Sequence, residues 1–324
     1  MRKIVTFGGG GGQAQILCGL REYDDLDITA VCTASDSGRS TGAIRRDYGV
    51  GGYLGDVSKC MWGLSEKADL HQVMMYRFSE GSLAPHSVKN CIFTALIREY
   101  GPDRALAIMH ELFGLPARFR VMPATFEDVS LSVRMGGTWV SDETYIDEIW
   151  RNPLWDPSLH LINDARLEPQ AQALPAVIRA IREADRIVVC CGDLYTSVIP
   201  ALLPGGIKEA VSASSAMVIQ VVNLVTKPGE TDGYEARDFV RQVAARIGRQ
   251  PNYVVCNDGR IPQEVLDRYW EAERKIALVP PHGDSIFGLE GSLVRADIWR
   301  LDSEGHLVHD GGKTAQVLYQ LINR

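Results

Sequence analysis

Short runs of apolar, often β-branched residues recur along the chain. They are apolar at consecutive positions, which is typical of parallel strands buried on both faces. Five such runs occur, at residues 4–7, 28–32, 186–190, 217–222 and 253–256. Helical patterns lie between them, at residues 13–23, 169–184, 206–213 and 234–247. This alternation predicts βαβ units, and therefore a doubly wound α/β fold with a mainly parallel sheet.

The middle and the end of the chain follow a different pattern. Residues 57–115 are mostly helical, whereas residues 118–147 favour short strands, with a hairpin around the turn Gly136-Gly137. We interpret about 57–165 as a helical and hairpin insertion between two halves of one sheet. About 275–324 is then a small C-terminal extension that ends in a helix. On this interpretation the whole chain, 1–324, is a single domain.

The composition excludes several classes of protein. The 324 residues have a net charge of -7, whereas a general nucleic-acid-binding protein has a basic face. The sequence contains no apolar run long enough to cross a bilayer. The seven cysteines show no C-x-x-C spacing and mostly have apolar neighbours, as free thiols in a reducing compartment do. We therefore expect a cytoplasmic protein that has neither nucleic acid nor a membrane as a partner.

Five consecutive glycines, 8–12, follow the first predicted strand and precede the first predicted helix. Glycine lets the backbone turn sharply and approach a ligand closely. The helix behind the turn directs free N–H groups and a partial positive charge toward it, which suits a phosphate. A plain tight turn is the alternative, but its five glycines would lose much backbone entropy on folding. The sequence therefore predicts that Gly9, Gly10, Gly11 and Gly12 bind phosphate groups.

The second predicted strand is followed by a loop that offers a carboxylate, several hydroxyls and a guanidinium. Asp36 stands where dinucleotide-binding folds place an acid on a ribose hydroxyl, and beside a diphosphate it also suits Mg²⁺. An ordinary helix N-cap is the structural alternative. From this loop we predict Asp36 as a catalytic residue and metal ligand, and Ser37, Arg39, Ser40 and Thr41 as ligand-binding residues.

Two shorter motifs lie in the helical middle of the chain. Asp56 is either the cap of the following helix or a catalytic residue. His86 and Asn90 are four residues apart, so a helix would place them on one face. A lone histidine is more often structural, and only the other loops make His86 and Asn90 candidates for ligand binding.

Two further junctions between strand and helix contain small and hydroxyl residues. The candidates for ligand binding are Gly192, Asp193, Tyr195, Thr196 and Ser197 in the first junction, and Asn223, Thr226 and Lys227 in the second. Asp193 also suits a helix N-cap, and Lys227 suits solvent as well as a phosphate. In a parallel sheet all such turns open on one edge, where ligands bind at the point of strand reversal. The distant junctions therefore predict one crevice for a nucleotide diphosphate.

Other familiar catalytic motifs are absent from the sequence. No G-K-(S/T) follows the glycines, which excludes a P-loop, and there is neither a G-x-S-x-G elbow nor Cys/His zinc spacing. Gly9, Gly11 and Ala14 also fit the pattern G-x-G-x-x-A. A nicotinamide-dependent dehydrogenase that uses Asp36 is therefore an alternative hypothesis, and it ranks last because the chain lacks an obvious acid for hydride transfer.

Taken in order, these loops resemble the motif set of the CofD-like superfamily. The set comprises the glycine-rich start, T-x-x-D-x-G-x-S-(S/T)-G, G-D, H-S-x-x-N, P-A-T, L-Y-T-S and N-L-x-T-x-P-G-E-T. The resemblance extends from Ile4 to the tail, where Val308-His309-Asp310 is closer to the gluconeogenesis-factor (YvcK-like) branch than to the phospholactate transferases. It implies a Rossmann-like sheet and a nucleotide-diphosphate ligand.

The two branches of the superfamily imply different functions. The gluconeogenesis-factor branch is associated with UDP-sugar binding and with control of cell shape and wall metabolism. The transferase branch uses Mg²⁺ to move a phospholactyl group from a guanosine-diphosphate-linked donor to a deazaflavin alcohol, as in coenzyme F420 synthesis. Mg²⁺ is thus the one cofactor that the resemblance suggests, and no covalent cofactor is implied. The sequence leaves the oligomeric state open, with a homodimer as one option.

The chain departs from the superfamily pattern at several of these positions. Ser37 replaces a second Asp or Asn, and Arg39 replaces Gly. The usual Arg-Asn of the G-D motif reads Ser58-Lys59, and the usual Gly of H-S-L-G-N reads Lys89. A lost carboxylate weakens a metal-dependent transfer, and the added cations favour a different anion. We therefore expect a nucleotide-binding regulatory protein first and a transferase second.

Overall fold

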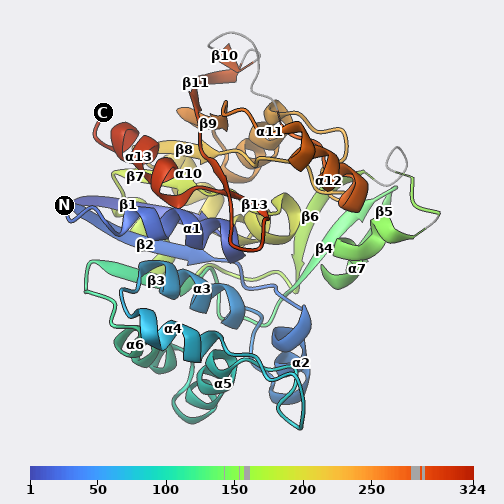
Figure 1. Ribbon diagram of the computed structural model, residues 1–324. Coiled ribbons are helices and arrows are strands. Elements are labelled where there is room, and N and C mark those ends of the chain that lie inside the picture. Colours follow the sequence, from blue (N-terminus) through green and yellow to red (C-terminus); the bar gives the residue numbers. More distant parts are fainter. Residues whose placement is uncertain (142, 153, 157–160, 279–284, 287–288) are drawn as a thin grey trace.

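A sheet of eight strands forms the centre of the computed structural model, which describes residues 1–141, 143–152, 154–156, 161–278, 285–286 and 289–324 (Figure 1). Seven of these described strands are parallel, and β10 pairs with β11 in the antiparallel direction. In spatial order the strands are β10 (Ser285–Ile286), β11 (Leu289–Ala296), β9 (Tyr253–Asn257), β8 (Met217–Val221), β7 (Arg186–Val189), β1 (Arg2–Gly8), β2 (Leu26–Cys32) and β3 (Phe119–Pro123).

The strand order reverses at β1, which lies between β2 and β7. From there β2 and β3 extend the sheet in one direction, and β7, β8, β9 and β11 extend it in the other. A sheet of this kind opens a crevice at the carboxyl ends of its strands beside the reversal. The predicted α/β, doubly wound and mainly parallel fold is confirmed, and the five predicted runs are β1, β2, β7, β8 and β9.

Two hydrophobic cores cover the two faces of the sheet, because side chains alternate along each strand. In β1, Ile4 belongs to the first core, whereas Val5 and Phe7 belong to the second. The first core lies under α1 (Gly10–Leu20), α3 (Leu54–Leu64) and α13 (Gly311–Ile322), and α1 packs against both α3 and α13. The second lies under α8 (Pro175–Glu183), α10 (Ile207–Ala213) and α11 (Ala236–Ile247). Both faces near the reversal are therefore covered, and its rim is left for the loops.

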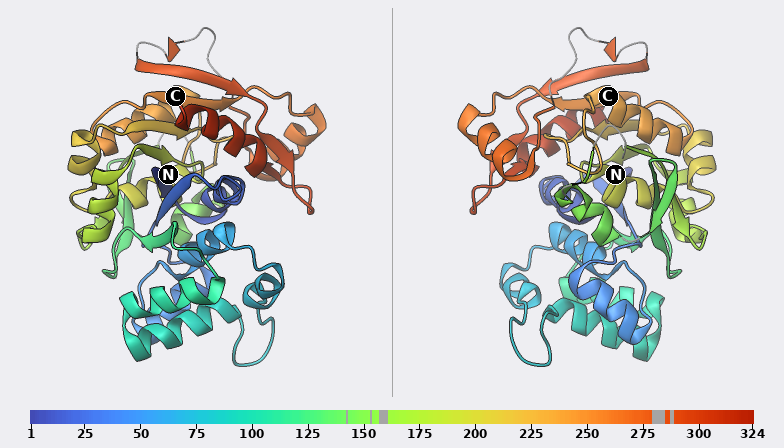
Figure 2. Two further views of the ribbon diagram at one scale, coloured as in Figure 1. Left: turned by 90° about the vertical axis from the view of Figure 1, so that its left-hand side faces the viewer. Right: turned by 90° about the vertical axis from the view of Figure 1, so that its right-hand side faces the viewer.

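The remaining elements surround this sheet. They are α2 (Arg39–Tyr48), α4 (Ala68–Met75), α5 (Val88–Tyr100), α6 (Pro102–Phe113), β4 (Ser130–Met135), β5 (Thr138–Ser141), α7 (Glu143–Glu148), η1 (Ile149–Arg151), β6 (Ile162–Glu168), η2 (Leu194–Val198), α9 (Ile199–Leu202), α12 (Gln263–Glu273), β12 (Trp299–Leu301) and β13 (Leu307–His309). Helices α4, α5 and α6 gather at one end of the molecule, and β10 and β11 lie at the other (Figures 1 and 2). Within the described residues, no helix combines the length and the apolar character that crossing a membrane requires.

The structure corrects the predicted boundaries in two places. The segment 57–165 is not one insertion, because β3 is the edge strand of the large sheet and separates α3–α6 from a small sheet ordered β5-β4-β6. The 275–324 segment is not only an extension, since β11 pairs with β9 and α13 packs on α1. Alternation of buried and half-buried residues along β3 explains the first error, because an edge strand with one face partly open resembles a hairpin strand.

Candidate functional site

The glycine turn joins β1 to α1 at the reversal point, and other predicted loops meet it there. A Cβ atom built on Gly9 would lie 2.8 Å from Asp56 Oδ2 and 3.3 Å from the backbone oxygen of Ser197. A Cβ on Gly12 would overlap the backbone oxygen of Cys191. The turn at 8–12, the start of α3 and the 192–197 turn therefore lie side by side on one rim of the sheet.

The local backbone explains why this turn is made of glycine. Gly10 has a φ of 60°, in the left-handed region that glycine adopts without steric cost. Helix α1 begins at Gly10 without any side-chain cap, so its first N–H groups have no partner from a capping side chain. Because Gly11 and Gly12 line a cleft, these donors and the positive end of the helix dipole border a space large enough for a ligand.

That space, which we call the rim cleft, measures about 290 Å³. Its walls are the first turn of α1, the turn after β7, the loop after β8, Lys275, and β13. Among the predicted residues it contains Gly11, Gly12, Gly192, Asp193, Asn223, Thr226 and Lys227. The cleft lies at the reversal of strand order, where the fold places a ligand.

On the other side of the glycine turn lies a group of charges that we call the Lys89 cluster, formed by Asp36, Asp56, Lys59 and Lys89. Lys59 Nζ is 3.3 Å from Asp56 Oδ1. Burial, and after it the charge of Asp56, raises the pKa of Asp36, so the two carboxylates lie close to each other. Lys89 is only 4% exposed and donates one long hydrogen bond, 3.5 Å, to the Gly55 oxygen. The structure thus brings the two predicted catalytic aspartates together with two lysines that the sequence had indicated only as departures from the superfamily pattern.

The pKa shifts of the two lysines differ in direction. The negative charge of Asp56 raises the pKa of Lys59. Burial, reinforced by the charge of Lys59, lowers the pKa of Lys89 to about 8. Both results follow from the same rule: a nearby opposite charge favours the charged form, whereas burial and a like charge disfavour it. Lys89 is therefore an incompletely compensated ammonium group.

Polar residues of α2 and α5 border the Lys89 cluster. Ser40 Oγ lies 3.1 Å from His86 Nδ1 and accepts a hydrogen bond of 3.0 Å from Asn90 Nδ2. Asn90 is 3% exposed, and its Oδ1 atom has no hydrogen-bond partner among the described residues. The side chain of Arg39 lies outside the described part of the structure. His86, Ser40 and Asn90 therefore form one chain of contacts, but His86 precedes α5, so the predicted placement of His86 and Asn90 on one helical face does not hold.

The loop at 35–42 is held in place by Asp36. Its Oδ1 accepts a hydrogen bond of 2.9 Å from the Gly38 N–H, which is the geometry of an Asx turn leading into α2. The Thr41 hydroxyl is hydrogen-bonded to the same carboxylate. A Cβ on Gly55 would lie 3.0 Å from Asp36 Oδ2, so the second oxygen faces the start of α3. Asp36 thus has a structural role in the loop and also faces the cluster.

A second group of charges, the Lys227 cluster, borders the rim cleft. Lys227 Nζ lies 2.6 Å from Asp147 Oδ1, 2.7 Å from Asp193 Oδ2 and 2.7 Å from Glu230 Oε1. The Glu230 side chain is fully buried and also accepts hydrogen bonds from the Tyr195 N–H (2.9 Å) and the Thr196 hydroxyl (2.8 Å). These carboxylates raise the pKa of Lys227 despite its burial. The sequence analysis offered phosphate or solvent as the partner of Lys227. In the structure its partners are three carboxylates.

Several predicted ligand-binding side chains instead hold the turns together. Tyr195 is fully buried, and its hydroxyl bonds to the Ile162 oxygen (3.1 Å) and to the Tyr234 hydroxyl (2.8 Å). Asn223 Nδ2 donates to the Gly192 oxygen (2.7 Å), and Thr226 Oγ1 accepts from the Ile276 N–H (3.0 Å). The Tyr195 phenol therefore lies in the second core, and ligand binding by Tyr195 stays a prediction.

His309 lines the far wall of the rim cleft and was missed as a site residue. It is 7% exposed, and neither ring nitrogen has a hydrogen-bond partner among the described residues. Burial lowers its pKa to about 4, so the ring is neutral at pH 7. A neutral imidazole holds one donor and one acceptor, and leaving both unsatisfied is costly. In the sequence His309 contributed only to the family pattern of the tail, and no spacing indicated its place.

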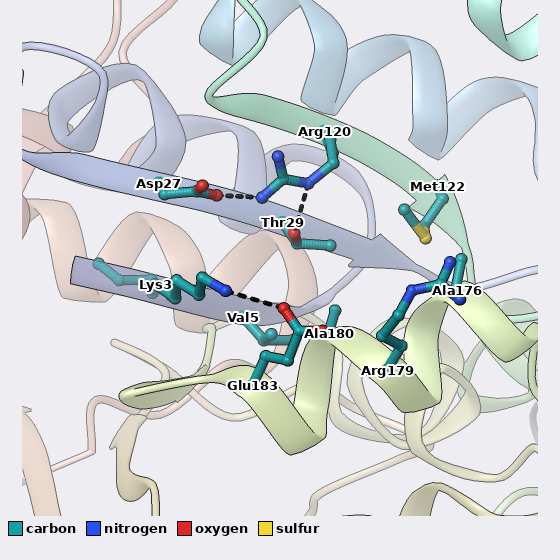
Figure 3. Close-up of a pocket in the computed structure, with 11 residues that line it drawn as sticks. Lys3, Val5, Asp27, Thr29, Arg120, Met122, Ala176, Arg179, Ala180 and Glu183 are labelled. Atoms are coloured by element: carbon teal, nitrogen blue, oxygen red, sulfur yellow. Dashed lines mark hydrogen bonds and ion pairs between the residues drawn. The ribbon is translucent and has the colours of Figure 1, made fainter. Parts of the chain in front are cut away.

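Another hollow, of about 230 Å³, lies between α8 and the first three strands (Figure 3). Lys3 Nζ on β1 pairs with Glu183 Oε2 on α8 at 2.8 Å, and Arg120 on β3 pairs with Asp27 on the neighbouring strand β2. Arg120 Nε also donates to Thr29 Oγ1 at 3.2 Å. Four charges of the hollow thus neutralise one another in pairs, Arg179 adds one positive charge, and no predicted motif lines the hollow. The rim is therefore the better candidate for the functional site.

The fold and this rim define a Rossmann-like α/β protein with a polar site at the reversal of its sheet. The chain belongs to the CofD family, since the family model for 2-phospho-L-lactate transferase CofD matches residues 4–284. It is 34% identical to the gluconeogenesis factor of Bacillus subtilis, over 99% of this chain and 98% of that protein. It is 30% identical to the gluconeogenesis factor of Halalkalibacterium halodurans, over 98% of this chain and 96% of that protein. The family resemblance seen in the motifs is thereby confirmed.

Comparison of structures and lengths adds two facts. The crystal structure of protein BH3568 from Bacillus halodurans matches with a TM-score of 0.89 and 28% identity, over 100% of this chain and 99% of that chain. Relatives from Deinococcus radiodurans and Nostoc sp. are longer, and the chain spans 66% and 68% of their lengths. The fold of the family is therefore present along the whole chain, and some relatives contain additional sequence.

Proposed function

We propose that this protein binds a UDP-sugar-like nucleotide diphosphate at the rim and acts as a regulator of cell shape and wall metabolism. One observation carries the proposal: the uncapped first turn of α1 borders a 290 Å³ cleft at the point of strand reversal. Free N–H groups at a helix start bind phosphates, and a cleft of this size at such a point suits a nucleotide. Relatives over nearly the whole chain are named gluconeogenesis factors and not transferases, which favours a regulatory role over the transferase.

The cytoplasm is the compartment that we propose for this function. All seven cysteines are free thiols, two of them, Cys190 and Cys191, on the strand end beside the glycine turn. Free thiols persist in a reducing compartment. A homodimer stays a proposal, and size-exclusion chromatography with light scattering tests it.

The second candidate is a phospholactate-type transferase, which the proximity of Asp36 and Asp56 favours. Mg²⁺ in such sites takes one or two carboxylates together with substrate phosphates. Here the Lys59 ammonium lies 3.3 Å from Asp56, and the described residues contain no group of three or more His, Cys, Asp or Glu suited to a metal. The residues at this position therefore fit a resident Mg²⁺ poorly, and we rank the transferase second.

A thermal-shift panel with UDP-glucose, GDP plus Mg²⁺, and NAD tests the proposal. A ligand at 100 times its Kd stabilises the folded state by about 2.7 kcal/mol. We expect UDP-glucose to raise the unfolding temperature and the other two ligands to have less effect. Stabilisation by NAD alone would favour a dehydrogenase. Turnover of a guanosine-diphosphate-linked donor with a deazaflavin alcohol would replace the regulatory function by the transferase.

A further inference from the structure

Lys59 lies beside the glycine turn. A Cβ on Gly10 would lie 3.7 Å from Lys59 Nζ and 3.6 Å from Asp56 Oδ1. Lys59 and Asp56 are separated by one helical turn of α3, and their ion pair is 3.3 Å long. The Lys59 ammonium therefore borders the same backbone N–H groups that are directed toward a phosphate.

Lys89 provides a second, independent cation from another helix. It lies in the first turn of α5 and is 4% exposed. No carboxylate lies within ion-pair distance of its Nζ among the described residues, and its hydrogen bond to the Gly55 oxygen is 3.5 Å long. An ammonium group has three donors, and burying one without compensation is costly. Such a group is suited to an anion that reaches it from outside the chain.

Lys59 lies where a divalent cation shared by Asp36 and Asp56 would have to bind, and Lys89 is close enough for the charges of Asp36, Asp56 and Lys59 to act on it. An ion shared by Asp36 and Asp56 would meet the Lys59 ammonium at Asp56, and it would also feel the charge of Lys89. Lys59 and Lys89 act on each other as like charges, since Lys59 contributes to the lowered pKa of Lys89. An anion bound by both lysines would relieve that repulsion, whereas a metal ion would increase it.

We propose that Lys59 and Lys89 together replace a divalent cation, so that this protein binds the phosphoryl groups of its ligand without a metal. The inference rests on the proposed nucleotide diphosphate and names the groups that bind its phosphates. The nucleotide occupies the rim cleft, and its diphosphate extends over the first N–H groups of α1 to the Lys59 and Lys89 ammonium groups on the other side of the glycine turn. Asp56 orients Lys59, and Asp36 holds the adjoining loop.

Isothermal titration calorimetry with UDP-glucose and with inorganic pyrophosphate tests this inference. We expect the wild-type protein to bind both probes with affinities that agree within twofold in EDTA and in Mg²⁺. Lys59→Met and Lys89→Met should each weaken binding at least tenfold. The control Lys313→Met removes a charge from an exposed lysine that pairs with Asp297, and it should change the affinity less than twofold. Circular dichroism melts confirm that each variant is folded.

A reciprocal variant asks whether the lysines and a metal are alternatives. The double variant K59N/K89G restores the residues usual in the superfamily pattern at both positions. We expect it to lose binding in EDTA and to recover at least tenfold in affinity when Mg²⁺ is added. If that variant binds equally in both conditions, the lysines are not replacing a metal.

The outcomes separate this inference from the proposed function. If the wild-type protein needs Mg²⁺ to bind UDP-glucose, or if both single lysine variants bind as the wild type does, the inference fails and the proposed function stands. The inference also fails if pyrophosphate does not bind. If the wild-type protein binds neither probe, the proposed function fails as well.

Discussion

The Lys89 cluster and the Lys227 cluster lie on the same rim and contain the same kinds of residue, yet they are built differently. Lys227 is surrounded by three carboxylates within 2.7 Å, and one of them, on Glu230, is fully buried. Lys89 has one long hydrogen bond to a carbonyl oxygen and no ion pair within the described residues. The protein itself supplies opposite charges that pair with Lys227, whereas it supplies no ion pair for Lys89 within the described residues.

This difference indicates which cluster supports the fold and which awaits a ligand. Lys227 joins α7, the turn at η2 and the 223–231 loop, so it holds three segments together. Lys89 makes one long hydrogen bond, to the Gly55 oxygen at the start of α3, and its burial lowers the stability of the fold. A buried charged residue that lowers the stability of the fold is a better candidate for function than one whose ion pairs offset the cost of its burial.

The comparison predicts its largest effect for Lys227→Met. Removing the ammonium leaves Asp147, Asp193 and the buried Glu230 without a counter-ion, and breaking such a buried pair costs about 3–5 kcal/mol. The free energy of unfolding should fall by that amount in urea denaturation. Lys208→Met, at an exposed position of α10, is the control and should change it by less than about 0.5 kcal/mol. A Lys227→Met variant as stable as the wild type would show that the two clusters do not differ as described.

A second prediction concerns His309, the other uncompensated group at the rim. Its pKa is about 4 in the folded state because of burial, against an ordinary 6.5, so the unfolded chain binds the proton more readily. Stability is therefore intact above pH 6.5 and is lost as the pH falls toward 4, by about 3 kcal/mol at pH 4. Urea denaturation at pH 7 and pH 4 measures this loss. His309→Gln should lose about 3 kcal/mol less than the wild type over that range, and an equal loss would contradict the assignment.

The sequence was sufficient to predict the centre of the sheet but not its edges. The runs that became β1, β2, β7, β8 and β9 are apolar on both faces, which few other structures explain. In β3 the polar Arg120 alternates with apolar residues, because this edge strand has one face partly open. Local pattern alone cannot distinguish such a strand from one in a hairpin.

The same limit applies to the site. The glycine turn and the loop at 35–42 were found because their composition is unusual at a strand end. The ion pairs of Lys227 were not predicted, since Asp147 lies 80 residues away and only the small sheet and α7 bring it to the rim. The burial of Lys89 also could not be predicted from the sequence. Lysine is usually exposed, and here it is the packing of α5 against α3 that excludes water.

Applying the Lys→Met substitution to the other cluster sharpens the comparison. Lys89→Met replaces a poorly compensated buried charge with an apolar side chain of similar length, which is neutral or stabilising. We expect the free energy of unfolding to stay the same or to rise by about 1 kcal/mol. The same urea experiment as for Lys227→Met measures it. A loss of 3 kcal/mol or more would show that Lys89 supports the fold as Lys227 does.

The smallest expected effect on stability comes from adding one methyl group to the glycine turn. A Cβ on Gly11 would have no atom within 4 Å, and Gly11 lines the rim cleft, so the methyl group of Gly11→Ala would occupy the path of a phosphate. Alanine is also the better helix former, by at most about 1 kcal/mol. Gly11→Ala should therefore be as stable as the wild type or slightly more so, while its affinity for UDP-glucose in calorimetry falls at least tenfold.

Gly312→Ala, in the first turn of α13, provides the matched control, because its Cβ would make only ordinary contact, 3.5 Å from Asp310 Oδ1, and it does not line the cleft. Unchanged affinity in Gly11→Ala would mean that no ligand approaches the start of α1. The difference between the Lys227 cluster and the Lys89 cluster would then have no bearing on ligand binding.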